Sequence, residues 1–248
     1  MNVLVTAGNT SVPIDRVRCL TNVFTGRTGA ALAAHAHRAG HAVILLTSHP
    51  EAAAALWGRS EPDARWRQVP YTTFDDLQNL MGRHLVEDRP DVVIHCAAVS
   101  DYLSAGVYAA APGTRFDPAA AVWQADSGAA ALVDRAAGKV KSDEPELWLR
   151  LVRAPKLVDR VRTDWRFRGL LVKFKLEVGI DDERLLRIAE ASRVHSGADL
   201  MVANTLEGAA AYAFLGPLAG QYERVERSRL AERLFAALDR LARERRHG

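Results

Sequence analysis

The chain has 248 residues and a mass of 27.1 kDa, which suits one α/β domain or one domain that carries a long insertion. Hydrophobic residues make up 48% and charged residues 25%, a balance that excludes a disordered chain and a disulfide-stabilised miniature. The net charge is +3, and a basic C-terminal segment with leucines at helical spacing predicts a packed terminal helix rather than a nucleic-acid partner.

The first fifty residues alternate apolar strands with one helix. Residues 2–6 are predicted to form a buried strand that runs into a turn at residues 7–10, which a phosphate could approach closely. The pair Gly26 and Gly29 opens an alanine-rich helix that Gly40 ends, and residues 42–47 follow as a second buried strand. This order is a β-loop-α-β unit.

The rest of the chain continues the alternation. Further strands are predicted at residues 66–69, 91–96, 169–174 and 200–203, and helices at 74–86, 181–196 and 227–245. We therefore expect a Rossmann-like α/β fold with three layers, α/β/α, and a mostly parallel sheet. Ligands of such a sheet bind at the carboxyl ends of its strands.

One segment breaks this pattern. Residues 103–138 are rich in Ala, Gly and Pro and follow neither the helical nor the strand period. We predict an insertion without clear regular structure, acting as a lid or a dimer arm, within a single domain of residues 1–248.

The usual dinucleotide signals are missing. Gly8 lies eighteen residues before Gly26, which is the wrong spacing for G-x-G-x-x-G, and Ser48-His49-Pro50 puts no acid where a ribose would be held. No tyrosine is followed by lysine four positions later. A nicotinamide or flavin reductase is therefore a disfavoured alternative.

Polar and small residues collect at the predicted strand ends and loops, and together they suit an anionic ligand. Glycines at a helix start present amide groups to phosphate, and an arginine binds a second anion through two hydrogen bonds. The set is Gly8, Arg18, Asn22, Gly26, Gly29, Asp101, Lys139, Lys141, Lys175 and Asn204.

Seven short motifs are distributed along most of the chain. They are V-T-A-G-N-T at 5–10, R-C-L-T-N at 18–22, G-R-T-G at 26–29, A-A-V-S-D at 97–101, G-K-V-K-S at 138–142, F-K-L-E at 174–177 and V-A-N at 202–204. With them the chain resembles the phosphopantothenate–cysteine ligases, and several segments are closer to the eukaryotic, ATP-using branch than to the bacterial, CTP-using one.

The resemblance implies an enzyme of coenzyme A biosynthesis. Its members use ATP or CTP with Mg²⁺ to join 4′-phosphopantothenate to cysteine through an acyl-nucleotide intermediate. It further implies a homodimer in the cytoplasm, with neither nucleic acid nor membrane as a partner. It leaves open whether the decarboxylase is a separate chain. The two cysteines, far apart in sequence, and the lack of a long apolar run agree with that setting.

The resemblance also assigns roles to residues of this chain. The expected nucleotide-binding residues are Gly8, Gly26, Gly29, Phe174, Lys175 and Asn204. The expected phosphopantothenate-binding residues are Asn22, Ala97, Ala98, Asp101 and, across a dimer interface, Arg18. The expected catalytic residues are Asn22, Lys139 and Lys141, and metal ligands are not identified.

The chain departs from the family pattern at two positions. Phe24-Thr25-Gly26 stands where Ser-Ser-Gly is usual, and Asn9 stands where a second glycine is common. These changes, with the insertion, keep a further alternative open, namely a non-catalytic protein that binds a nucleotide or a pantothenate derivative.

Overall fold

The computed structural model describes residues 1–57 and 63–247 and divides the chain into two compact units. The first unit consists of Met1–Thr10, Val23–Val99 and Lys156–Gly248. The second unit consists of Ser11–Asn22 and Ser100–Pro155. The second unit is therefore larger than the insertion predicted at residues 103–138, and it draws on a segment close to the amino terminus.

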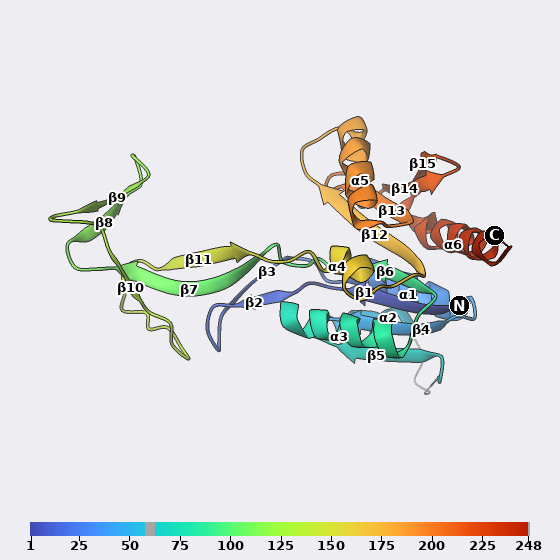
Figure 1. Ribbon diagram of the computed structural model, residues 1–248, viewed down its shortest axis with the longest axis horizontal. Coiled ribbons are helices and arrows are strands. Elements are labelled where there is room, and N and C mark those ends of the chain that lie inside the picture. The colour runs from blue at the N-terminus through green and yellow to red at the C-terminus, as the bar shows by residue number, and fades with distance from the viewer. Residues whose placement is uncertain (58–62, 248) are drawn as a thin grey trace. The chain divides into compact units, whose positions relative to one another are not determined.

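The first unit is built on an eight-stranded sheet (Figure 1). Its strands are β1 (Asn2–Ala7), β4 (Ala42–Thr47), β5 (Trp66–Pro70), β6 (Val92–His95), β12 (Leu170–Glu177), β13 (Leu200–Thr205), β14 (Tyr212–Leu218) and β15 (Gln221–Glu226). They lie in the order β15-β14-β13-β12-β6-β1-β4-β5, and all neighbours from β13 to β5 are parallel. The mostly parallel α/β fold is thus confirmed, with an antiparallel pair, β14 and β15, at one edge.

Helices cover both faces of this sheet. They are α1 (Arg27–Arg38), α2 (Pro50–Trp57), α3 (Phe74–Glu87), α4 (Leu157–Thr163), α5 (Asp182–Ser196) and α6 (Leu230–His247), with a short 3₁₀ turn, η1 (Arg227–Arg229), before α6. Leu32 of α1 and Leu234 of α6 are buried with Val5 of β1 in one core. On the opposite face, Leu185 of α5 packs with Met201 of β13. Within the described residues, no helix has the length and apolar character needed to cross a membrane.

The second unit consists of short antiparallel strands. They are β2 (Ser11–Pro13), β3 (Cys19–Thr21), β7 (Tyr102–Ala110), β8 (Thr114–Asp117), β9 (Val122–Ala125), β10 (Leu132–Asp134) and β11 (Trp148–Arg153). Strand β7 lies between β10 and β11, while β2 pairs with β3 and β8 pairs with β9. The expectation that this insertion lacks regular structure was therefore wrong. Strand β7 contains three alanines and a glycine, residues with weak strand preference, and β8, β9 and β10 have only three or four residues each. Pairing with neighbouring strands therefore decides their conformation.

Candidate functional site

Three predicted glycines come together where β1 ends and α1 begins. Gly8 and Gly26 have φ angles of +92° and +71°, which only glycine adopts without strain. A Cβ atom on Gly26 would lie 2.6 Å from the Gly8 nitrogen, and one on Gly29 would lie 2.6 Å from the Ala7 Cβ. These glycines, which we call the glycine cluster, allow the start of α1 to sit directly on the end of β1.

No side chain caps the amino end of α1. Its N-cap is Gly26, which supplies no side-chain acceptor, and its first turn contains no acidic residue. By contrast, Thr73 caps α3 and Asp181 caps α5 through side-chain oxygens. Because the first amide groups of a helix lack partners within the helix and carry its positive end, the start of α1 suits a phosphate group.

Asn9 is held by the end of the neighbouring strand β4. Its backbone N–H donates to Ser48 Oγ at 2.9 Å, and Ser48 Oγ donates back to Asn9 Oδ1 at 2.8 Å. His49 Nε2 lies 3.0 Å from the same Oδ1, and His49 Nδ1 lies 3.1 Å from Glu51 Oε1. The asparagine that replaces a common glycine therefore braces the turn after β1, a role that the sequence analysis missed.

Ala97 and Ala98 lie against the same turn. The Ala98 N–H donates to Gly8 O at 2.8 Å, and the Thr10 N–H donates to Ala98 O at 3.3 Å. The Ala97 N–H donates to Thr6 Oγ1 at 3.2 Å. Small residues after β6 thus adjoin the turn after β1, at the crevice where sheets of this kind bind ligands.

A buried histidine lies directly beneath these alanines. Thr6 Oγ1 is 3.0 Å from His95 Nδ1, so the hydroxyl links the His95 ring to the Ala97 amide. Burial, with a smaller effect of the nearby Lys173 ammonium, lowers the pKa of His95 to about 4. The ring is therefore neutral at pH 7, and its neutrality preserves this link.

Stability should depend on pH through His95. The unfolded chain protonates this histidine below pH 6.5, whereas the folded chain resists protonation until about pH 4. The free energy of unfolding should therefore fall by about 3 kcal/mol as the pH drops from 6.5 to 4, at about 1.4 kcal/mol per pKa unit. The free energy of unfolding, measured by urea denaturation at each pH, should fall less steeply with decreasing pH in His95→Gln than in the parent. His195→Gln, which changes a histidine whose side chain is 75% exposed, is the control. Parallel curves for the parent and His95→Gln would contradict the assignment.

Strand β12 carries two predicted nucleotide-binding residues, Phe174 and Lys175, whose side chains point to opposite faces of the sheet. Phe174 is partly buried against the core on the α1 face, and Asn204, 9% exposed, lies on that face because of the strand register. Lys175 points to the opposite face, where its Nζ lies 2.8 Å from Glu177 Oε1. The α1 face therefore collects the glycine cluster, Phe174 and Asn204.

In the second unit, Asp15 joins two predicted segments. Arg18 donates to its carboxylate through Nε and Nη2 at 3.1 and 2.7 Å, and the Val140 N–H donates to Asp15 Oδ2 at 3.0 Å. Arg18 Nη2 also donates to Val140 O at 2.9 Å. The Arg18 guanidinium, followed by the Val17 N–H, holds the pKa of Asp15 far below its usual range.

This arrangement fixes the Lys-x-Lys segment at its middle residue. Val140 is buried, whereas Lys139 and Lys141 are exposed on either side of it. Asp101 and Asn22 also belong to the second unit. The Asp101 carbonyl accepts a hydrogen bond from the Ala154 N–H at 2.9 Å, and Asn22 is half-buried. Asp15 was not among the predicted site residues, although it lies in the P-I-D segment just before Arg18.

No group of three or more His, Cys, Asp or Glu side chains in residues 1–57 and 63–247 is placed to hold a metal ion. Mg²⁺ commonly binds to proteins through one or two carboxylates together with substrate phosphates. A magnesium ion held mainly by substrate phosphates does not need such a group of protein ligands.

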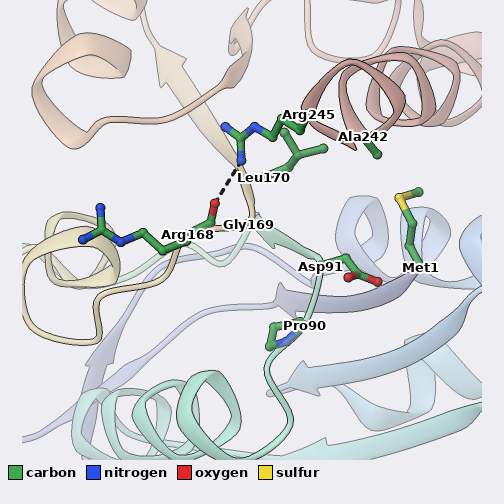
Figure 2. Close-up of a pocket in the computed structure, with 8 residues that line it drawn as sticks. All are labelled: Met1, Pro90, Asp91, Arg168, Gly169, Leu170, Ala242 and Arg245. Carbon is green, nitrogen blue, oxygen red and sulfur yellow. Dashed lines mark hydrogen bonds between the residues drawn. The ribbon is translucent and has the colours of Figure 1, made fainter. Parts of the chain in front are cut away.

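A pocket of about 470 Å³ opens at the other end of the sheet (Figure 2). It lies beside the amino ends of β1, β6 and β12 and is lined in part by Asp91, Arg168 and Arg245. The Arg245 guanidinium donates to the Arg168 carbonyl and to the Asp199 carboxylate. Since ligands of parallel sheets bind at the carboxyl ends, this pocket is not the candidate site.

Comparison with known proteins agrees with the sequence motifs. Residues 1–110 match the family described as DNA/pantothenate metabolism flavoprotein C-terminal domain. The coenzyme A biosynthesis bifunctional protein CoaBC of Thermococcus kodakarensis is 29% identical over 96% of this chain and 51% of its own length. Phosphopantothenate–cysteine ligase 2 of Oryza sativa subsp. japonica is 26% identical over 82% of this chain and 68% of its own.

A solved structure extends the match to the whole fold. The crystal structure of the DNA/pantothenate metabolism flavoprotein from Streptococcus pneumoniae aligns with a TM-score of 0.74 at 25% identity, over 97% of this chain and 99% of that chain. The resemblance to the phosphopantothenate–cysteine ligases is therefore confirmed. The chain spans about half the length of the CoaBC protein of T. kodakarensis that it matches.

Proposed function

From this relationship we propose that the chain is a nucleotide-dependent ligase that forms the amide between 4′-phosphopantothenate and cysteine in coenzyme A biosynthesis. One observation supports it most: the glycine cluster, the uncapped start of α1 and the Ala97–Ala98 segment meet at the carboxyl ends of β1 and β6. This arrangement can bring the anionic groups of two ligands together.

The proposed reaction has two steps. First, a carboxylate oxygen of phosphopantothenate attacks the α-phosphorus of ATP or CTP, and the bond from that phosphorus to the leaving pyrophosphate breaks. Next, the cysteine nitrogen attacks the acyl carbon, loses a proton and displaces the nucleoside monophosphate. A free carboxylate is a poor electrophile, so the first step makes the second possible.

Both steps develop negative charge, which cations and amide groups stabilise. We propose that Gly8, Gly26, Gly29, Phe174 and Asn204 bind the nucleotide and that Asn22, Ala97, Ala98, Asp101 and Arg18 bind phosphopantothenate. Asn22, Lys139 and Lys141 are proposed to assist acyl transfer, and Lys175 remains a further nucleotide-binding candidate. Mg²⁺ would neutralise the phosphates.

Pyrophosphate release tests the proposal. It should require 4′-phosphopantothenate and a nucleoside triphosphate with Mg²⁺, and phosphopantothenoylcysteine should appear when cysteine is added. Absorbance change of a dinucleotide without pyrophosphate would instead indicate a reductase. Binding of a nucleotide or pantothenate derivative without turnover would indicate the non-catalytic alternative.

We also propose that two copies pair through the second unit. Of its residues, all of which the structure describes, only Val12, Val107, Ala109 and Val140 are buried apolar side chains. Exposed apolar side chains are frequent on its strands. They include Tyr102, Val122, Leu132, Leu151 and Val152. A unit with so small a core and so much exposed apolar surface suits a second copy as its cover.

A charge on this surface should separate the copies. Leu151 lies on β11 and is 43% exposed. Leu151→Glu should convert the dimer to a monomer, because an unpaired carboxylate would be buried at the interface. Light scattering coupled to size-exclusion chromatography gives the mass directly. Val194→Glu, which alters an exposed valine on α5 of the first unit, is the control and should leave the mass unchanged. A Leu151→Glu dimer would place any interface elsewhere.

The setting of the enzyme is also proposed. Cys19 and Cys96 are free thiols, as expected of a protein in the reducing cytoplasm. We also propose a decarboxylase as the partner that takes up the ligation product, which the bifunctional CoaBC relatives support and which leaves open whether it is a separate chain.

A further inference from the structure

Arg227 lies at the start of α1 although it is far away in sequence. It is the first residue of η1, after β15, and is half-buried. Its Nη2 donates a hydrogen bond to Thr28 Oγ1, and Thr28 is in the first turn of α1. In the sequence it stands out only as part of a basic terminal helix.

Cys96, which follows β6, also lies close to Arg227 and to the start of α1. Burial raises the pKa of the Cys96 thiol to about 12, while the Arg227 guanidinium and a hydrogen bond from the Gly29 backbone act in the opposite direction. Arg227, the Gly29 amide and the Thr28 hydroxyl therefore converge on one place. Cys96 and Phe174 pack on the same core, so this place belongs to the α1 face of the sheet.

The charges at this place are unbalanced. The start of a helix carries partial positive charge and repels a cation, yet Arg227 is held there and Arg27 opens the helix. The first turn of α1 contains no acid, and no ion pair among residues 1–57 and 63–247 joins Arg227 to a carboxylate. A guanidinium in this setting is stabilised by an external anion.

We propose that Arg227, oriented by Thr28, binds a phosphate group of the nucleoside triphosphate together with the first amide groups of α1. This inference rests on the proposed function and adds a cation that neither the motifs nor the resemblance supplied. The arginine, which comes from the other end of the chain, supplies a full positive charge that the helix end lacks.

The test is binding of inorganic triphosphate and of ATP or CTP, with Mg²⁺, to the full chain by isothermal titration calorimetry. Arg227→Gln should weaken binding of all of them by about 10- to 100-fold, as loss of a charge-assisted hydrogen bond predicts. Binding of the nucleoside without phosphates should not change. Arg229→Gln, in the same turn and already paired with Glu232, is the matched control and should bind within about twofold of the parent.

The outcomes separate this inference from the proposed function. Ligase activity with unchanged nucleotide affinity in Arg227→Gln would overturn the inference and leave the function standing. Triphosphate binding that depends on Arg227, in a parent protein without ligase activity, would support the inference and overturn the proposed function. No triphosphate binding by the parent would overturn both. If Arg227→Gln does not fold, Arg227→Lys, which keeps the charge but loses the planar fork, should still bind triphosphate more weakly than the parent, and equal binding would count against the proposal.

Discussion

Replacement of Lys139 by alanine is expected to slow pyrophosphate release by about 100- to 1,000-fold, the usual loss when one group that stabilises transition-state charge is removed. Lys139 is exposed beside the anchored Val140, so its truncation should leave the fold intact. The measurement is kcat at saturating phosphopantothenate and nucleotide, determined with a coupled assay for pyrophosphate. A similar loss is expected for Asn22→Ala.

Lys156→Ala is the control for Lys139. Lys156 is also an exposed lysine and stands at the N-cap of α4, in the first unit. Its truncation should change kcat by less than about twofold, as expected for an exposed side chain outside the site. Full activity in Lys139→Ala would remove this lysine from the mechanism, and equal losses in the two variants would point to a general charge effect.

The second large effect is expected at the glycine cluster. Gly26→Ala should lower the free energy of unfolding by at least about 3 kcal/mol, because the alanine must adopt a left-handed backbone and its Cβ would overlap backbone atoms. Those atoms are the Gly8 nitrogen and Cα, at 2.6 and 2.9 Å. Urea denaturation measures the loss, and triphosphate binding should fail with it.

Gly220 provides the matched comparison, since it lies in the same unit with a φ of +84°, and a Cβ added to it would meet nothing within 4 Å beyond its chain neighbours. Gly220→Ala should therefore cost only the backbone term, about 1–2 kcal/mol. The difference between the two variants isolates the close approach of α1 to β1. Equal losses would mean that the turn relaxes and that tight packing is not the reason for Gly26.

The long elements of the first unit could be predicted because they carry a clear hydrophobic period. The helices at 74–86 and 181–196 and the strands at 42–47 and 200–203 are confirmed to within a few residues. The shorter helices α2 and α4 and the antiparallel strands β14 and β15 were missed. Each of the two helices has only about two turns, β14 contains Gly216-Pro217, and β15 is mostly polar, so none of them has the unbroken apolar run of β4 and β13.

The candidate site could be predicted only in part. The glycines and the alanine pair stand out in the sequence because their spacing matches a family pattern, and the structure brings Gly8, Gly26, Gly29 and Ala98 together. The roles of Asp15 and Arg227 depend on partners more than one hundred residues away. Such pairs leave no local signal, so only the folded chain reveals them.

The chain passes between the two units four times, after Thr10, Asn22, Val99 and Pro155. Within the second unit, Asp15 from one passage and Val140 from the other are bound to each other, and Arg18 bonds to both. Both bonds to residue 140 are made to its backbone, so recombination with a relative over residues 100–155 would keep them wherever the incoming loop brings its amide group to the same place. Asp15 and Arg18 lie three positions apart and would be inherited together in such an exchange.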